Sequence, residues 1–394
     1  MNENKKEIIK YDFLYYIRYT GDAFFYPFVW FFFNSLGYQN SQISYILLIA
    51  PAVSFFVNPF WSIVSKNANS NKIIGGIFSV IEAVAIVLLI YFNAPLYLAI
   101  IVFLIISIAG QPFYILLDGY TVNFCTEIKY EYTKIRIFGS ISYTVATLIA
   151  AILINRMDYT ISFYVAGGLF ILTSVIMFLL RPLESSSNTE IAQKADLKLL
   201  FKNKYFYFFS LVFILWISTQ TSIDSYLGGF FKDIYSYDRS QYMYIMFGFI
   251  LTEVIVIMLL FKFGEKINVI LIVLLGMFAN ILRYFLNFLQ LPVPVIIIAS
   301  MLRGISMSFY IYSYFRILKK IVKQRNITAA NLITNSVASV YRVSVILAGG
   351  YIANDPSNYK YLFLIGIILT VVGTIFIVPL AKNRESVNYD VGNW

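Results

Sequence analysis

The chain has 394 residues, of which 60% are hydrophobic and only 13% charged, and its 30 lysines and arginines outnumber its 20 acids. Soluble domains carry about 25% charged residues, so this composition excludes a soluble globular protein and indicates many membrane-spanning segments. The sequence has no histidine and one cysteine, Cys125, which excludes a disulfide framework and the usual zinc and catalytic-triad sites. A phosphate-binding loop of the G-x-x-x-x-G-K-[ST] type is also missing.

Long apolar runs follow one another along the whole chain. A helix needs about 20 apolar residues to cross the hydrocarbon core of a bilayer. Twelve runs meet this length, at 12–36, 41–65, 72–93, 95–124, 134–155, 159–181, 204–231, 239–263, 267–289, 292–320, 328–353 and 358–381. We therefore predict an all-α membrane protein with a six-helix bundle over 1–181, a cytoplasmic linker over 182–203 and a second six-helix bundle over 204–394.

Basic residues are distributed unevenly between the two sides of these runs. Of the 30 lysines and arginines, 21 lie in segments on the side of the N-terminus, 4 lie on the opposite side and 5 lie within the runs. Cytoplasmic loops of membrane proteins are enriched in lysine and arginine, so both termini are predicted to be cytoplasmic. Topology accounts for the net charge of +10, and we do not expect nucleic-acid binding.

Charged side chains also occur inside the apolar runs. Each costs roughly 2.5–3.5 kcal/mol on insertion scales, and a chain that served only as an anchor would not keep them. The residues concerned are Arg18, Asp22, Glu82, Asp118, Asp224, Glu253, Arg283, Arg303, Arg316 and Arg342. A set containing both signs is typical of side chains arranged around a polar cavity, which indicates a transporter.

Asp118 and Arg136 flank the loop predicted at 125–133, and the midpoint between them, residue 127, lies inside this loop. Two antiparallel helices joined there place both residues at a similar depth, where they can face each other. An ionised aspartate and an arginine can bind a polar ligand through paired hydrogen bonds. The alternative is a buried salt bridge that only fixes the helical hairpin.

The segment from Tyr132 to Ser140 resembles the Y-G-x-x-R-x-[WF]-G-S motif of one branch of the major facilitator superfamily. That branch includes lactose permease, with the oligosaccharide:proton symporters, and the phenylpropionate permeases. The resemblance implies two six-helix bundles that rock around a central site. It also implies that Asp118, Arg136 and Tyr143 contact the substrate, although tyrosine replaces the tryptophan that stacks on the sugar ring in that family.

The second half extends the resemblance. Glu253, Arg283 and Asp224 match charged positions of lactose permease, and Arg303 replaces a histidine. The resemblance implies that these four residues couple substrate movement to proton movement. Ser306 stands where the family has its proton-carrying glutamate, so we expect Glu253 to be the carrier, with Asp224 and Asp22 as substitutes.

The remaining buried charges leave alternatives open. Arg18 and Asp22 are four residues apart and can pair along one helix face, or Asp22 can line the cavity and contact substrate. Glu82 is either structural or a proton site, and the role of Arg342 is not assigned. Arg316 lies near the cytoplasmic end of its run and can extend toward the interface.

Together these features predict a secondary active transporter that moves a sugar, an oligosaccharide or a nucleoside-like solute by proton symport and alternating access. The alternatives are proton-coupled transport of an aromatic or other organic anion, and a flippase for lipid-linked saccharides. We expect no cofactor besides the coupling proton. The expected partners are a small-molecule substrate and the lipid bilayer, and the protein is expected to be a monomer. An enzyme is not expected, because a catalytic loop and a His/Asp cluster are both missing. The richness in Ile, Asn, Lys, Tyr and Phe suggests a bacterial origin, hence the cytoplasmic membrane of a bacterium.

Overall fold

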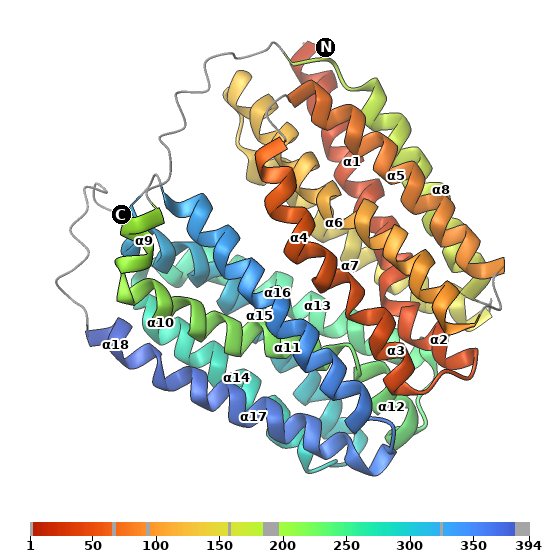
Figure 1. The fold of residues 1–394 in the computed structure, drawn as a ribbon, viewed down its shortest axis with the longest axis vertical. Coiled ribbons are helices and arrows are strands. Elements are labelled where there is room, and N and C mark those ends of the chain that lie inside the picture. The colour runs from red at the N-terminus through yellow and green to blue at the C-terminus, as the bar shows by residue number, and fades with distance from the viewer. Residues whose placement is uncertain are drawn as a thin grey trace. The chain divides into compact units, whose positions relative to one another are not determined.

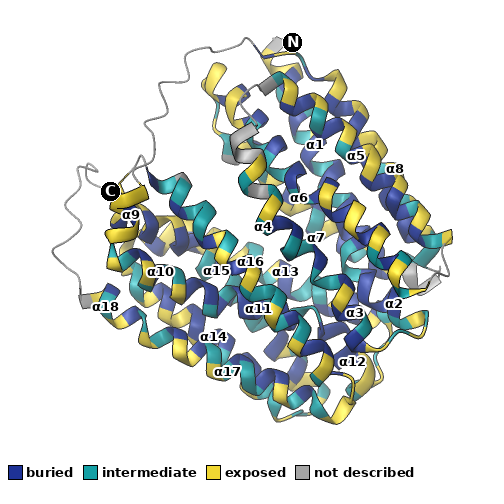
Figure 2. Cartoon of the chain, viewed as in Figure 1, coloured by how far each residue is buried: buried dark blue, intermediate teal, exposed yellow. Residues whose placement is uncertain are grey.

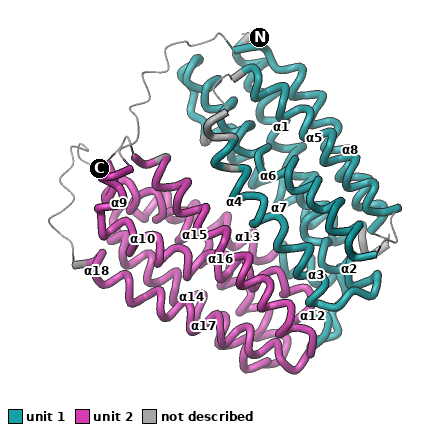
Figure 3. Tube along the Cα trace, in the orientation of Figure 1, with its two compact units in different colours: residues 1–187, 231–247 teal, residues 188–230, 248–394 magenta. Residues whose placement is uncertain are grey.

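The computed structural model describes residues 3–64, 68–91, 95–156, 159–183, 197–323 and 326–382. Within these ranges the chain is helical and contains no β-strand, as predicted. Two compact units form, one from residues 1–187 and 231–247 and the other from 188–230 and 248–394 (Figure 3). The predicted boundaries at 181 and 204 remain a prediction, and residues 184–196 of the predicted linker lie outside the described residues.

Unit 1 is built mainly from the helices of the N-terminal part. Its elements are α1 (Glu3–Phe25), the 3₁₀-helix η1 (Tyr26–Phe28), α2 (Val29–Ser35), α3 (Asn40–Leu47), α4 (Ile49–Val64), α5 (Ala68–Tyr91), α6 (Leu96–Glu127), α7 (Tyr132–Arg156) and α8 (Tyr159–Leu179). Helix α1 packs against α7 and α8, and α5 lies beside both α6 and α8 (Figure 1). Helix α1 therefore lies against two other helices of the unit.

Unit 2 contains most of the helices that follow. They are α9 (Leu197–Lys202), α10 (Lys204–Phe213), η2 (Ile214–Ser218), α11 (Thr219–Asp224), α14 (Val269–Phe288), α15 (Val293–Ile321), α16 (Ile327–Ile352), α17 (Tyr359–Ile375) and α18 (Ile377–Lys382), with the short 3₁₀-helices η3 (Gly264–Lys266) and η5 (Pro356–Asn358). Helices α12 (Leu227–Tyr235) and α13 (Arg239–Phe263) contribute residues to both units. Helix α14 packs against α15 and α17, and α11 packs against α16.

Eleven helical segments in the described part of the chain are long and apolar enough to cross a membrane. They correspond one by one to the predicted runs from 41–65 to 358–381. The first predicted run, 12–36, forms α1, η1 and α2 and is less apolar, because it holds Arg18, Asp22 and several tyrosines. Those polar groups are tolerated because α1 packs inside its unit against α7 and α8.

The outward faces of the helices are apolar. In α8 the exposed positions include Ile161, Ile171, Val175 and Leu179, and comparable exposed bands run along α5 (Figure 2). In water such surfaces would be unfavourable, whereas lipid solvates them. Backbone amides in lipid must be paired within the segment, which a helix achieves on its own. The exposed apolar faces therefore agree with a protein that sits in a bilayer.

Local sequence signals set some of the helix ends. The side chains of Asn203 and Asn268 accept hydrogen bonds from the backbone amides of Tyr205 and Ile270, at 3.0 and 2.8 Å, and so cap α10 and α14. Between α10 and α11 the chain makes one turn of π-helix, η2, inside the span 204–224. Such π-bulges occur often at functional sites, and this one directly precedes the helix that carries Asp224.

Candidate functional site

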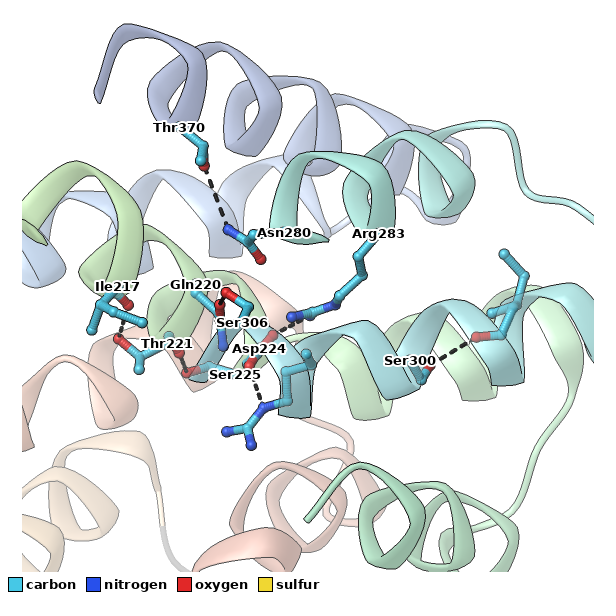
Figure 4. A network of polar contacts seen from close by, with 12 residues as sticks. Ile217, Gln220, Thr221, Asp224, Ser225, Asn280, Arg283, Ser300, Ser306 and Thr370 are labelled. Atoms are coloured by element: carbon cyan, nitrogen blue, oxygen red, sulfur yellow. Dashed lines mark hydrogen bonds and ion pairs between the residues drawn. The ribbon is translucent and has the colours of Figure 1, made fainter. Parts of the chain in front are cut away.

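Four charged side chains from four helices meet in unit 2. Asp224, the last residue of α11, accepts a short hydrogen bond from Arg283 of α14 and a second one from Nε of Arg303 of α15, at 2.9 Å (Figure 4). Nη1 of Arg303 lies 3.4 Å from Oε2 of Glu253 on α13. The structure thus brings together all four residues predicted to form the proton-coupling network.

Helix periodicity explains why Arg283 points into the network. The buried residues of α14 recur every three or four positions and include Gly276, Asn280, Arg283 and Asn287, so they form one inward face. Arg283 is 1% exposed, and its Nη1 has no hydrogen-bond partner in the described residues. A buried donor of this kind is costly when left unpaired, so it is available to a ligand or to water.

Charge is balanced within the network, which has two arginines and two acids. Its members differ in accessibility, because the Glu253 side chain is 24% exposed and that of Asp224 is 13% exposed. Asp224 is held by two guanidinium groups, whereas Glu253 has a single ion-pair partner among the described residues, Arg303. Glu253 is therefore the carboxylate that separates most readily from its counter-charge.

Three further residues in this region form a hydrogen-bonded chain that the sequence did not predict. The Trp216 indole donates to Oγ of Ser306 at 2.9 Å. Ser306 in turn donates to Oε1 of Gln220 at 2.7 Å (Figure 4). Nε2 of Gln220 is buried and has no partner in the described residues. The only sequence signal was that Gln220 lies one helical turn before Asp224, so both side chains share a face of α11.

In unit 1, Asp118 and Arg136 do not form the ion pair that the hairpin argument predicted. Among the described residues no such contact is present within 4.0 Å. Instead, Tyr15 donates to Asp118 at 2.5 Å, and the Arg136 guanidinium lies over the rings of Tyr19 and Tyr15, with centroid distances of 4.5 and 5.8 Å. The reason is that α1, which packs on α7, supplies two tyrosines to this site.

Tyr143 is partly buried on α7, seven residues after Arg136 and hence on the same helical face. The structure does not test its predicted contact with substrate. Its contact with substrate stays a prediction.

A second charged cluster in unit 1 joins Arg18, Glu82 and Asp22. The guanidinium of Arg18 makes two hydrogen bonds to Glu82, at 2.6 and 3.2 Å, and lies 3.3 Å from Asp22. All three side chains are 5% exposed or less. Asp22 also accepts a short hydrogen bond from Tyr114, and Glu82 accepts one from Tyr26 at 2.9 Å.

The predicted pair Arg18 and Asp22 is therefore present, but Glu82 is the closer partner of Arg18. The guanidinium is also sandwiched between the rings of Phe113 and Phe170, at 4.3 and 4.0 Å. The sequence missed this arrangement because Glu82 lies 64 residues away on α5. Asp22 is buried in this cluster, and its predicted substrate contact stays a prediction.

The other two membrane arginines lie in different surroundings. Arg316, near the end of α15, is exposed and its guanidinium lies 4.0 Å from the centroid of the Tyr312 ring. Arg342, in the middle of α16, donates to Oγ of Ser339 at 2.9 Å and pairs with no carboxylate of the described chain.

Comparison with known proteins decides the family. The model of the family described as MFS_1 like matches residues 8–379. The chain belongs to this family. A curated relative of this MFS_1 like chain is the "Uncharacterized transporter YwbF" of Bacillus subtilis (strain 168), which is 22% identical over 359 residues, covering 89% of the chain and 88% of the relative.

Solved structures share the fold of this MFS_1 like protein. The nucleoside transporter NupG matches with a TM-score of 0.79 and 16% identity, covering 98% of this chain and all of NupG, and a point mutant of NupG matches with a TM-score of 0.80. A bacterial homolog of the human lysosomal transporter Spinster, in an inward-facing and occupied conformation, matches with 0.72 and 10% identity over 97% of both chains. These identities show the fold alone.

The family confirms the predicted relationship to the major facilitator superfamily and the predicted all-α membrane fold. The chain is a multi-pass membrane transporter and not an enzyme, and a small molecule and the lipid bilayer are its partners.

Proposed function

We propose that this transporter couples the movement of a small polar solute to the movement of a proton, by symport and alternating access. The solute is of the sugar, oligosaccharide or nucleoside kind. The observation that carries the proposal is the network of Glu253, Arg303, Asp224 and Arg283, in which one carboxylate depends on a single ion pair among the described residues. The nucleoside transporter among the structures with the same fold supports the nucleoside member of this class.

Proton binding follows from the cost of isolated charge. As long as Arg303 lies beside Glu253, the carboxylate is stable as an anion. When a change of conformation draws Arg303 away, an unpaired carboxylate in a low-dielectric site is strongly unfavourable, and a proton neutralises it. Asp224 retains Arg283 in that event, so Glu253 is the residue that takes up and releases the proton.

The N-terminal residues supply the solute contacts in this proposal. Asp118 and Arg136 offer an acceptor and a donor group, and Tyr143 offers an aromatic face and a hydroxyl. Asp22 completes the set from α1. Proton coupling needs no cofactor. The protein acts as a monomer in the cytoplasmic membrane of a bacterium, with both termini in the cytoplasm.

Glu253→Gln tests the proposal in proteoliposomes. The pH of the outer solution is recorded while disaccharides, nucleosides and aromatic acids are added in turn to the wild type. We expect alkalinisation with a sugar or a nucleoside, and loss of roughly nine-tenths or more of this signal in Glu253→Gln, while exchange of labelled solute across the membrane persists. Exchange persists because the glutamine keeps the shape of the site but cannot carry a proton.

The matched control is Glu265→Gln, which removes a carboxylate from the short helix η3 outside the network. This variant should keep the full proton signal. Undiminished proton-driven accumulation in Glu253→Gln would show that another residue carries the proton.

An organic anion is the second candidate solute, and one observation favours it. Arg342 is a membrane arginine without a carboxylate partner among the described residues, so it can neutralise a negatively charged substrate.

A further inference from the structure

Arg342 is an uncompensated cation in the middle of a membrane helix. One of its amino groups donates to Ser339 of the same helix at 2.9 Å, and its Nε is buried without a hydrogen-bond partner among the described residues. Arginine at this depth is strongly unfavourable unless a counter-charge or water reaches it. Within the described part of the chain no acid does so, and the guanidinium is therefore open to water or to an anion from elsewhere.

The other buried arginines of unit 2 do not share this situation. Arg283 and Arg303 are matched by Asp224 and Glu253, so that network is neutral by itself. It has no negative charge to spare for Arg342. The membrane part of unit 2 therefore carries a net positive charge in the absence of a ligand.

Arg342 belongs to a stripe of polar residues along one face of α16. Asn331, Asn335, Ser339 and Arg342 recur at helical spacing, so they lie on one face. The amide of Asn335 donates to Oδ1 of Asn331 at 2.8 Å, and Ser339 donates to the Asn335 carbonyl at 2.9 Å.

Exposure shows what this face meets. Asn335 is exposed although it lies within the span 329–352. On the opposite face Val337 and Val340 are 52% and 50% exposed and suit lipid. A polar stripe of this kind is poorly solvated by lipid, so we infer that the face with Asn335 and Arg342 is turned toward a polar surrounding and not toward the bilayer.

The neighbouring helix adds a second free donor. Tyr310 of α15 lies one helical turn before Tyr314, with ring centroids 5.4 Å apart, and the Tyr314 hydroxyl donates to Oδ1 of Asn331 in the stripe at 2.9 Å. Its hydroxyl makes no hydrogen bond to any residue that the structure describes, and its ring contacts Phe213 and Trp216 with centroid distances of 5.7 and 6.2 Å. Beside the polar stripe there is thus an aromatic wall.

We propose that Arg342 and Tyr310 bind an oxyanion of the transported solute, either a carboxylate or a phosphate ester. This inference rests on the proposed transport function and favours, among its candidate solutes, the molecules that carry a negatively charged group. Guanidinium and hydroxyl donors match the acceptor oxygens of such a group, and the ion pair satisfies the buried cation. An organic anion without a sugar, such as an aromatic acid, satisfies the same requirement.

Matched pairs of charged and neutral compounds test the proposal. The pairs are glucuronate and glucose, uridine 5′-monophosphate and uridine, and 3-phenylpropionate and its amide. The thermal midpoint of the purified protein reports binding, because a ligand of the folded state raises it. We expect the charged member of at least one pair to raise the midpoint more than its neutral partner. The identity of that pair distinguishes a phosphate ester from a carboxylate.

Arg342→Gln should weaken binding of the charged member about ten-fold or more, and Tyr310→Phe should weaken it less. Arg342→Lys should keep part of the affinity. The matched control, Arg316→Gln, removes an exposed arginine of unit 2 and should leave binding unchanged. Without ligand, Arg342→Gln should fold at least as well as the wild type, since it removes an unpaired charge, whereas a structural arginine would lower the thermal midpoint.

Charged members that bind no better than their neutral partners would overturn the inference, as would unchanged affinity in both Arg342→Gln and Tyr310→Phe. Uptake assays separate this result from failure of the proposed function. Proton-coupled uptake of neutral uridine that is indifferent to Arg342 refutes the oxyanion site and leaves proton coupling intact. Uptake of an anion that depends on Arg342 but moves no proton supports the oxyanion site and refutes proton coupling.

Discussion

Asp224 is the residue on which the charge network of unit 2 depends, because it accepts hydrogen bonds from both Arg283 and Arg303. Removing one partner of a buried ion pair costs roughly 3–5 kcal/mol, because the remaining charge is left uncompensated. Removing partners of both signs costs less, since the net charge is restored. Stability therefore reports on the pairing independently of transport.

Asp224→Asn should lower the stability of the folded protein by roughly 3 kcal/mol or more, since two arginines then face Glu253 alone. Arg283→Gln should also be destabilising. In the variant that combines Asp224→Asn with Arg283→Gln, the loss of stability should be smaller than the sum of the two single losses, because Arg303 and Glu253 remain paired. Thermal or denaturant unfolding in detergent measures all three, and strictly additive losses would show that Asp224 and Arg283 do not interact.

Single residues also show the limit of sequence reasoning. The grouping of Asp224, Glu253, Arg283 and Arg303 was predictable, because family motifs place each of them at a known depth in its helix. The pairing of Arg18 with Glu82 was not, since helix rotation about its own axis decides it and the sequence gives no direct measure of that rotation. The same holds for Tyr15, which takes the place beside Asp118 that Arg136 was predicted to occupy.

At the scale of helices, the spans were readily predicted because hydropathy over some 20 residues outweighs local detail. Eleven of them match a helical span of the described chain, and the clearest difference is the seventh, which ends at Asp224 and not at residue 231. The π-helical turn η2 was not anticipated, since no residue type in Ile214–Ser218 signals it. Close approach between helices has a clearer signature in glycine, and Gly304 is the sharpest example in unit 2.

A methyl group added at Gly304 would lie 2.2 Å from the carbonyl oxygen of Phe249 and 2.8 Å from the amide nitrogen of Glu253. Both atoms belong to the backbone of α13, so neither can rotate away. Gly304→Ala should therefore push α15 from α13 and break the contact between Arg303 and Glu253. We expect lower thermal stability and a several-fold weaker proton signal in proteoliposomes.

Gly168→Ala is the matched control for this helix contact, because nothing lies within 4 Å of the added methyl group. It should keep the proton signal of the wild type and be at least as stable. Wild-type behaviour of Gly304→Ala would mean that α13 and α15 separate without cost.

At the scale of the whole molecule, the count of crossings and the placement of charge act together. If the polar first run crosses the membrane like the eleven apolar spans of the described chain, the number of crossings is even and both ends of the chain lie on the same side. The excess of lysine and arginine on that side then predicts that it is the cytoplasm. The buried acids and arginines do not enter this argument, because they lie within the helical units.

Fusions to a reporter enzyme that is active only outside the cytoplasm test this topology. A fusion after Lys382, which ends α18, should be inactive, whereas a fusion truncated after Asn354, between α16 and η5, should be active. The reason is that one span, 356–381, separates the two positions. A fluorescent protein that matures only in the cytoplasm should give the reverse pattern. Activity of the enzyme fused after Lys382 would contradict the orientation, and equal activity at both positions would contradict the crossing of the last span.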